Sequence, residues 1–448
     1  MWWDGKITRT FRCRLTQTPG ILGRLLAAIG DQGGLIGEIR IITMGGSAIV
    51  RDITVYADDL RHLDRLIGII RGFADVELLE VRDEVLEMHQ GGKIAIRSRY
   101  DISSLATLRR IYTPGVAEVS LKIKEDPSLA RRFTSIRHLV AIVTDGTAVL
   151  GLGDIGPLAA MPVMEGKASL LETLTGLSGM PILLNTKDPE EIIRTVVHIS
   201  LTFSAIQLED ISAPRCFEIE RRIQDAVDIP VMHDDQHGTA CVVTAALLNA
   251  AKIARVDLTK AGIGVIGLGA AGFALSEMLM VYFKTPVLGA DIDPSALERL
   301  RQAGGTPSDL KTIMGSADVV IATTGVPGLI KKEMVRKGQI ILALSNPNPE
   351  IEPSVAMEAG AAFAADGKSV NNVLGFPGIF RGAVDANVPR ITREMLIAAA
   401  EAIAGFAPAG EIVPNPLDKN LHKTVARAVA RVAIEQGLNR DDLTGYFD

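Results

Sequence analysis

The sequence of 448 residues predicts an α/β protein with parallel sheets, preceded by a smaller module of ferredoxin-like strand order. Three observations lead to this prediction. From about residue 100 onward, short apolar runs alternate with helix-like stretches, as in βαβ units. A GxGxxG turn joins one such run to a helix, and residues 6–82 follow the order strand, helix, strand, strand, helix, strand. The composition agrees, because 47% hydrophobic residues with only 4% aromatic ones suit aliphatic sheets covered by helices.

The small module is expected to occupy residues 1–88. Pro19 and Gly20 stand at the entry of its first helix, and Asp58 or Asp59 is placed to cap its second. The segment TPGILGRLLAAIGDQGG resembles the regulatory ACT domain, and this resemblance implies an amino acid or another small effector bound between paired copies. Glycine placement alone equally allows a structural or dimerising module without a ligand.

Two larger regions are predicted after a boundary at Gly91 and Gly92. Residues 91–243 are expected to form a substrate-binding domain and residues 244–385 a Rossmann-like dinucleotide-binding domain. The helices of residues 386–448 are expected to pack back on the substrate domain. In parallel sheets ligands collect at the carboxyl ends of the strands, so polar residues directly after strands are the candidates for a site.

Charge and cysteine content indicate which binding partners and which cellular compartment to expect. A formal net charge of -6 without a long basic cluster argues against binding to nucleic acid or to an anionic membrane. Cys13, Cys216 and Cys241 are too far apart in sequence to suggest a disulfide framework or a zinc site, which favours the cytoplasm. Charged residues interrupt the start of the chain, and no apolar run approaches the roughly 20 residues of a membrane span. We therefore expect small-molecule partners, no secretion and no membrane insertion.

Gly267, Gly269 and Gly272 form the GxGxxG turn between an apolar strand and an apolar helix. Without side chains, their backbone can approach the pyrophosphate of a dinucleotide at the helix N-terminus. Asp291 ends the next predicted strand, where a carboxylate can accept hydrogen bonds from both ribose hydroxyls and would repel a 2′-phosphate. The pattern favours NAD over NADP, and the alternative is a glycine turn in an α/β unit that binds no dinucleotide.

Four carboxylates follow two neighbouring apolar runs. Glu209 and Asp210 end AIQLED, and Asp234 and Asp235 end IPVMHDD. Uncompensated carboxylates in one place repel one another, and a divalent cation removes this repulsion; ligands that are all oxygen favour Mg²⁺ or Mn²⁺. The alternative is helix capping, in which Asp210 or Ser212 starts one helix and Asp235 starts the next.

Several longer motifs are similar to those of the malic enzymes, which oxidise and decarboxylate malate. The resemblance runs from about residue 91 to residue 440 and is carried by YTPGVAEV, VTDGTAVLGLGDIG, EGKASLL, QLEDISAP, HDDQHGTA, LALSNPNPE and VNNVLGFPGIFRGA. The resemblance implies that Glu209, Asp210 and Asp235 are metal ligands. It implies Tyr112 as the catalytic acid and Lys167 as the base, with Asp234 beside that lysine. Asn346 and Asn372 would be amides near malate and nicotinamide.

The chemistry of malate oxidation calls for such groups. A lysine can remove the C2 hydroxyl proton only if burial and a nearby cation lower its pKa from about 10.4, and Lys167 lies in an otherwise apolar helix-like run. The residue pattern alone also allows a surface lysine there. Tyr112 is a neutral proton donor for the enolate that remains after CO₂ loss, and its alternative role is packing at a helix N-terminus.

One position departs from the malic enzyme pattern. Many members carry an arginine before LGLGD that pairs with a substrate carboxylate, whereas this chain has Ala148 and Val149 there. Another Arg or Lys from a facing subunit is the candidate to replace it. The sequence thus predicts an NAD-dependent, Mg²⁺- or Mn²⁺-requiring enzyme that converts malate to pyruvate and CO₂ as a homo-oligomer, at least a dimer. The alternatives are a 2-hydroxy acid dehydrogenase that stops at the keto acid and a non-catalytic sensor of dinucleotides or metabolites.

Overall fold

The computed structural model describes residues 6–45, 48–149, 151–368 and 370–447. The chain forms two compact units, residues 1–95 and residues 96–448, each with its own hydrophobic core. Among the described residues, no helix is long and apolar enough to cross a membrane.

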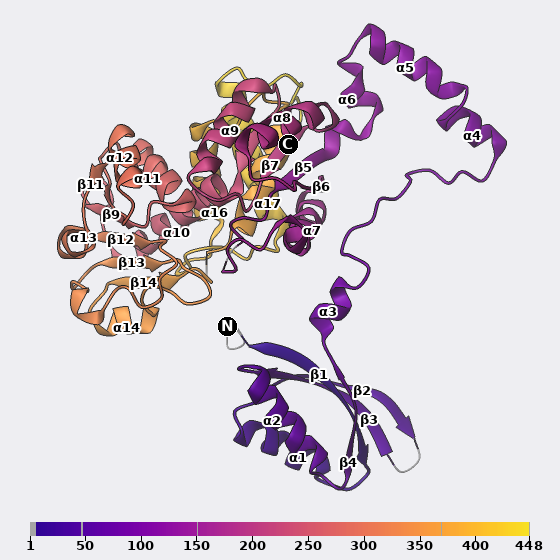
Figure 1. The fold of residues 1–448 in the computed structure, drawn as a ribbon, viewed down its shortest axis with the longest axis vertical. Coiled ribbons are helices and arrows are strands. Elements are labelled where there is room, and N and C mark those ends of the chain that lie inside the picture. Colours follow the sequence, from indigo (N-terminus) through magenta and orange to yellow (C-terminus); the bar gives the residue numbers. More distant parts are fainter. Residues whose placement is uncertain (1–5, 46–47, 150, 369, 448) are drawn as a thin grey trace. The chain divides into compact units, whose positions relative to one another are not determined.

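The first unit is a four-stranded antiparallel sheet with two helices on one face (Figure 1). Its sheet order is β2-β3-β1-β4, which is the predicted ferredoxin-like arrangement. The Asp59 side chain caps the second helix by accepting a hydrogen bond from the His62 backbone N–H at 2.7 Å. The resemblance of this unit to an ACT domain stays a prediction. The elements are β1 Ile7–Thr16, α1 Ile21–Asp31, β2 Leu35–Gly45, β3 Ala48–Ala57, α2 Leu60–Arg71, β4 Val76–Arg82 and α3 Glu84–His89.

The second unit contains two parallel sheets, as the alternating pattern predicts. The first has the order β6-β5-β7-β8 and carries helices that follow its strands. The side chains of β7 and β8, and all but the first of β5, are buried on both faces of the sheet, whereas those of the edge strand β6 are at most partly buried. The elements are β5 Leu139–Thr144, α7 Pro157–Thr175, β6 Ser178–Leu183, α8 Pro189–Ile199, β7 Ala205–Leu208, α9 Arg215–Ala226 and β8 Val231–His233.

The other parallel sheet has the order β11-β10-β9-β12-β13-β14, which places a topological switch point between β9 and β12. This is the Rossmann-like sheet expected from the glycine turn. The elements are β9 Ile263–Ile266, α11 Ala270–Phe283, β10 Leu288–Ala290, α12 Pro294–Gln302, β11 Thr306–Pro307, α13 Leu310–Ser316, β12 Val319–Ala322, β13 Ile340–Ala343, α14 Pro353–Glu358 and β14 Phe363–Asp366.

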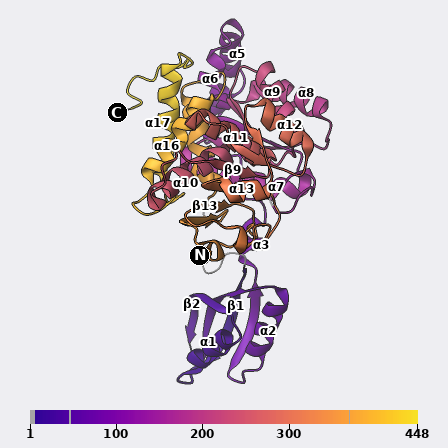
Figure 2. The same cartoon turned by 90° about the vertical axis from the view of Figure 1, so that its left-hand side faces the viewer.

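Four long helices lie between and around the two sheets. Helix α16 packs against α10 and α17, and α17 packs against α15 and α7, so the C-terminal helices contact the elements of the first parallel sheet (Figures 1 and 2). The bounds are α10 Thr239–Ala254, α15 Phe376–Asp385, α16 Arg393–Phe406 and α17 Lys419–Glu435.

Three short helices precede the first parallel sheet: α4 Leu105–Ile111, α5 Gly115–Glu125 and α6 Leu129–Phe133. None of them has a buried side chain. Several of their large apolar side chains are exposed, including 74% of Leu105 and 58% of Leu121. Such a run of exposed apolar side chains is typical of a surface that another molecule covers.

Candidate active site

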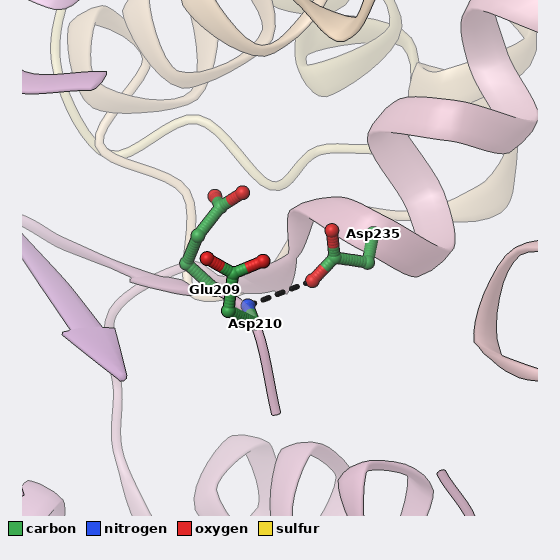
Figure 3. Close-up of side chains that lie close together, drawn as sticks. All are labelled: Glu209, Asp210 and Asp235. Carbon is green, nitrogen blue, oxygen red and sulfur yellow. Dashed lines mark hydrogen bonds between the residues drawn. The ribbon is translucent and has the colours of Figure 1, made fainter. Parts of the chain in front are cut away.

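The four carboxylates lie at the adjacent ends of β7 and β8. These strands are parallel, and Leu208 pairs in register with His233, so the residues that follow them meet at one edge of the sheet. Ligand oxygens of Glu209, Asp210 and Asp235 all lie within 4.8 Å of one another (Figure 3). The carboxylates predicted as metal ligands are therefore brought together.

The capping alternative is wrong for these residues. Helix α9 begins at Arg215 after Pro214, which makes no side-chain cap. Asp235 lies inside a single π-helical turn, Asp234–Gly238, that runs directly into α10. Its Oδ2 accepts a hydrogen bond from the Asp210 backbone N–H at 2.8 Å, so it faces the other carboxylates (Figure 3).

Burial and mutual repulsion perturb the carboxylates. Burial is the main cause that raises the pKa of Glu209 well above its ordinary value, and burial together with Asp235 raises the pKa of Asp210 to about 7. Burial would also raise the pKa of Asp235, but the hydrogen bond and charge of His233 outweigh it, so that pKa is lowered. Asp210 Oδ2 is buried without a hydrogen-bond partner. Three convergent oxygens, one of them unsatisfied, fit a hard divalent cation.

Lys167 extends from α7 into this cluster. Its Nζ lies 2.5 Å from Asp234 Oδ2, 2.9 Å from Glu209 Oε1 and 4.6 Å from the centre of the Phe376 ring. Only 14% of the side chain is exposed, so the surface-lysine alternative is wrong.

The pKa of Lys167 is raised, whereas a lowered pKa was expected from the sequence. Burial disfavours the ammonium, but the negative charges of Asp234 and Glu209 outweigh burial. A lowered pKa would require positive charge at the carboxylates, because such charge would cancel the field that they exert on Nζ.

Asp234 is held by close packing as well as by charge. Its Oδ2 accepts a hydrogen bond of 3.4 Å from the Asn372 amide, whose Oδ1 in turn accepts one from the Thr239 hydroxyl at 3.1 Å. A Cβ on Gly238 would stand 1.8 Å from Asp234 Oδ1. Glycine at 238 is therefore required if Asp234 is to face Lys167, and Asn372 belongs to the same cluster.

Tyr112 lies apart from these residues within the described chain. It ends α4, its side chain is 66% exposed, and its hydroxyl has no hydrogen-bond partner among the described residues. The fold of one chain does not bring this predicted acid into contact with Lys167.

The glycine turn has the geometry of a pyrophosphate cradle. Gly267 has a φ of 90°, and a Cβ there would stand 2.7 Å from Thr323 O; a Cβ on Gly272 would stand 1.9 Å from Gly267 O. A Cβ on Gly269 would meet nothing within 4 Å, so open space lies at the N-terminus of α11. Asp291 follows β10 beside this turn, and its Oδ2 accepts from the Leu268 N–H at 2.6 Å.

Asn346 follows β13 and approaches the first parallel sheet. A Cβ on Gly151, in the loop after β5, would stand 3.6 Å from Asn346 O. The predicted amide therefore lies where the loops of the two sheets meet.

Arg215 is a site residue that the sequence analysis missed, although it directly follows the quoted motif QLEDISAP. Its guanidinium donates to the Asp145 carboxylate, to Thr147 Oγ1 at 2.5 Å and to Lys187 O at 2.7 Å. The Thr147 and Ala148 N–H groups both donate to the backbone oxygen of Asp210. Arg215 thus holds the loop that carries Ala148 against a candidate metal ligand, and it is already paired with Asp145.

Comparisons with known proteins agree with this geometry. Residues 98–224 match the family model "Malic enzyme, N-terminal domain", and residues 357–435 match "Malic enzyme, NAD binding domain". NAD-dependent malic enzyme 1 of Bacillus subtilis is 54% identical over 428 residues, which cover 95% of this chain and 98% of that protein. The chain belongs to the malic enzyme family.

Other members support this membership at lower identity. The NAD-dependent malic enzyme of Geobacillus stearothermophilus is 43% identical over 93% of this chain and 92% of that protein. The crystal structure of the malic enzyme from Pyrococcus horikoshii is 38% identical, with a TM-score of 0.76 over 82% of this chain and 93% of that chain. In this malic enzyme, the stretch that matches the N-terminal family model contains Tyr112, Lys167, Glu209 and Asp210.

Proposed function

We propose that this malic enzyme converts malate to pyruvate and CO₂, with NAD as the hydride acceptor and Mg²⁺ or Mn²⁺ as the required ion. The observation that carries the proposal is the position of Lys167, whose ammonium lies between Glu209 and Asp234 beside the cluster of three carboxylates. Two relatives named as NAD-dependent malic enzymes, at 54% and 43% identity, support the substrate and the cofactor.

Glu209, Asp210 and Asp235 would hold the divalent ion, which when bound supplies Lewis-acid stabilisation of negative charge on the substrate oxygens. The neutral amine of Lys167 would be favoured by the positive charge of the ion, which offsets the field of the carboxylates at Nζ. In that form Lys167 accepts the proton of the C2 hydroxyl, and its buried position keeps water away from that transfer. Asp234 orients the lysine through the contact of 2.5 Å. Tyr112 donates the proton that C3 requires after CO₂ has left.

NAD would bind with its pyrophosphate at the open space beside Gly269 and its adenosine ribose at Asp291. The nicotinamide end would then lie near the carboxyl ends of β12 and β13, where Asn346 is positioned. Asn346 and Asn372 supply neutral amides to malate and nicotinamide without adding charge to the site.

The enzyme would act as a homo-oligomer in which Tyr112 reaches Lys167 of another copy. The exposed apolar side chains of α4 and α5, on both sides of an exposed Tyr112, support this arrangement because a second copy would bury them. A small effector would bind at the N-terminal unit. The enzyme would act in the cytoplasm, where its three unpaired cysteines are expected to remain reduced.

The test is an assay of purified protein with malate, NAD and Mn²⁺ that follows NADH, pyruvate and CO₂ together. Equal amounts of the three products support decarboxylating oxidation. NADH without CO₂ would identify the dehydrogenase that stops at the keto acid, and NAD binding without turnover would identify the sensor. Asp235→Ala is expected to abolish turnover at every Mn²⁺ concentration, and full activity in excess EDTA would refute the metal requirement.

A mixing experiment tests the arrangement of Tyr112. Lys167→Met and Tyr112→Phe are each expected to be nearly inactive alone. If Tyr112 acts on the partner's lysine, a mixed dimer contains one intact site, and an equal mixture should recover about a quarter of the wild-type activity. No recovery, with exchange of subunits verified by mass spectrometry, would place Tyr112 and Lys167 of one chain in the same site.

A further inference from the structure

Glu350 is a completely buried carboxylate in the Rossmann-like sheet, and its side chain is 0% exposed. It follows the loop after β13, two residues before the N-cap of α14. Among the described residues, no Lys, Arg or His forms an ion pair with it, and it lies outside the carboxylate cluster near Lys167. A buried carboxylate without a cation requires several hydrogen-bond donors, so the identity of these donors indicates its role.

The donors come from the loops after two neighbouring strands. Glu350 Oε1 accepts from the Thr324 N–H at 2.7 Å, from the Thr324 hydroxyl at 2.8 Å and from the Ser345 hydroxyl at 2.5 Å. Its Oε2 accepts from the Ser345 N–H at 3.3 Å. Thr324 lies just after β12 and Ser345 just after β13, and these strands pair in parallel. One side chain therefore joins the two loops at the carboxyl edge of the sheet.

The joined loops are adjacent to both parts of the proposed NAD site. The Gly325 N–H donates to Ser345 Oγ at 2.7 Å, which adds a direct link between the loops. Thr323 Oγ1 donates to Gly267 O at 3.0 Å, which connects the loop after β12 to the glycine turn. Asn346 directly follows Ser345. Any shift of Ser345 would therefore move Asn346 relative to the glycine turn.

We propose that Glu350 is a positioning residue that fixes the loops after β12 and β13, so that the nicotinamide end of NAD is held for hydride transfer. This inference rests on the proposed function. Glu350 does not touch the reacting atoms; it acts through Ser345 and Thr324. The donors around it distinguish it from a residue that only fills the core, because four N–H and O–H groups all point to one carboxylate.

Glu350→Gln is the decisive variant. Both carboxylate oxygens accept from donors, so either orientation of the glutamine amide places an NH₂ group against an N–H or O–H donor and pushes a loop away. The expected result is a roughly tenfold rise in the KM for NAD, with a lower kcat and a larger isotope effect for malate deuterated at C2.

Thr324→Val removes one donating hydroxyl at nearly constant volume and should produce the same changes, with a rise of about threefold in the KM for NAD. If Glu350→Gln does not fold, Thr324→Val and Ser345→Ala carry the test.

ADP-ribose separates positioning from general stability, because it contains the adenosine and both phosphates but lacks nicotinamide. The affinity of the variants for NAD should fall, while their affinity for ADP-ribose should stay within about twofold of the wild-type value. The matched control is Glu352→Gln, since Glu352 is exposed and its side chain makes no cap on α14.

An equal loss of affinity for NAD and ADP-ribose would overturn the proposal, and so would kinetic constants equal to those of the Glu352→Gln control. The binding measurements do not depend on turnover. An inactive wild-type enzyme would refute the proposed function, whereas altered NAD binding with unchanged ADP-ribose binding would still support the role of Glu350.

Discussion

Lys167→Met tests the contact at the centre of the proposed active site. Methionine keeps much of the length and volume of lysine but removes the ammonium. The lysine lies 2.5 Å from Asp234 and 2.9 Å from Glu209, whose side chains are 0% and 3% exposed. Removing one partner of a buried ion pair costs about 3–5 kcal/mol of unfolding free energy, because a buried charge is left uncompensated. Since two carboxylates lose their partner here, we expect a loss of about 4 kcal/mol or more without a divalent ion.

The size of this loss should depend on pH. Burial raises the pKa of both Glu209 and Asp234, and removal of the ammonium would raise each pKa further. A carboxyl group with a raised pKa in the folded state holds a proton that the unfolded state releases, so the free energy of unfolding falls as pH rises. The loss should therefore be largest near about pH 8 and smaller near about pH 5, where the folded variant can keep both protons.

Urea unfolding in EDTA at these two pH values measures the effect. Lys187→Met is the matched control, because Lys187 also lies 2.5 Å from a carboxylate, Asp154, but the two side chains are 63% and 48% exposed. An exposed pair contributes at most about 1 kcal/mol. In the malate assay, Lys167→Met should lower kcat by about 10²–10⁴-fold, as expected for loss of a general base. Unfolding of Lys167→Met like that of the control at both pH values, or full activity of the variant, would show that Lys167 is neither a buried ion-pair partner nor the base.

Three further results are expected. The pKa of Asp210 is about 7 in the folded protein instead of 3.8, so without metal the stability that this group contributes is lost as pH rises through that window. In thermal unfolding, Mn²⁺ at about a hundred times its Kd should add about 2.7 kcal/mol of stability near pH 8 and less near pH 5. A Mn²⁺ effect that is equal at both pH values would contradict this. Gly238→Ala should lower the free energy of unfolding by about 1–3 kcal/mol and remove most activity, because the Cβ of the alanine displaces Asp234. Normal kinetics of this variant would show that Asp234 can move at no cost. Asp291→Ala should reduce the preference for NAD over NADP in the ratio of kcat/KM values, and an unchanged ratio would show that another group selects the cofactor.

The sequence predicted the class of several elements because local patterns decide it. The apolar runs that end in acidic residues became β7 and β8, and the glycine turn lies between β9 and α11 as expected. A steric demand within the turn explains part of this, because a Cβ on Gly272 would stand 1.9 Å from the backbone oxygen of Gly267, only five residues earlier. The predicted ferredoxin-like order of the first unit is also confirmed, since alternating hydropathy and Asp59 as a cap are properties of nearby residues.

The capping alternative and the pKa of Lys167 could not be decided in this way. Whether Asp235 caps a helix depends on where the helix begins, and the Asp235 side chain instead accepts a hydrogen bond from the Asp210 N–H, which lies at the end of the neighbouring strand. The pKa of Lys167 depends on the distances from Nζ to two carboxylates more than 40 positions away in sequence. Such distances follow from the packing of α7 on the sheet, which no local pattern contains.

By itself, the sequence determined which chemical groups this malic enzyme possesses and at which strand ends they lie, because strand ends and glycine turns are local features. Only the tertiary structure decided how these groups meet: Arg215 binding the loop after β5, Glu350 joining two loops, and Tyr112 remaining exposed beside helices without a buried side chain. The physical reason is that hydrogen bonds need contact at about 3 Å and that Coulomb forces in water are screened beyond about 10 Å. Residues far apart in the chain therefore acquire a role only when the packing of the sheets brings them within that range.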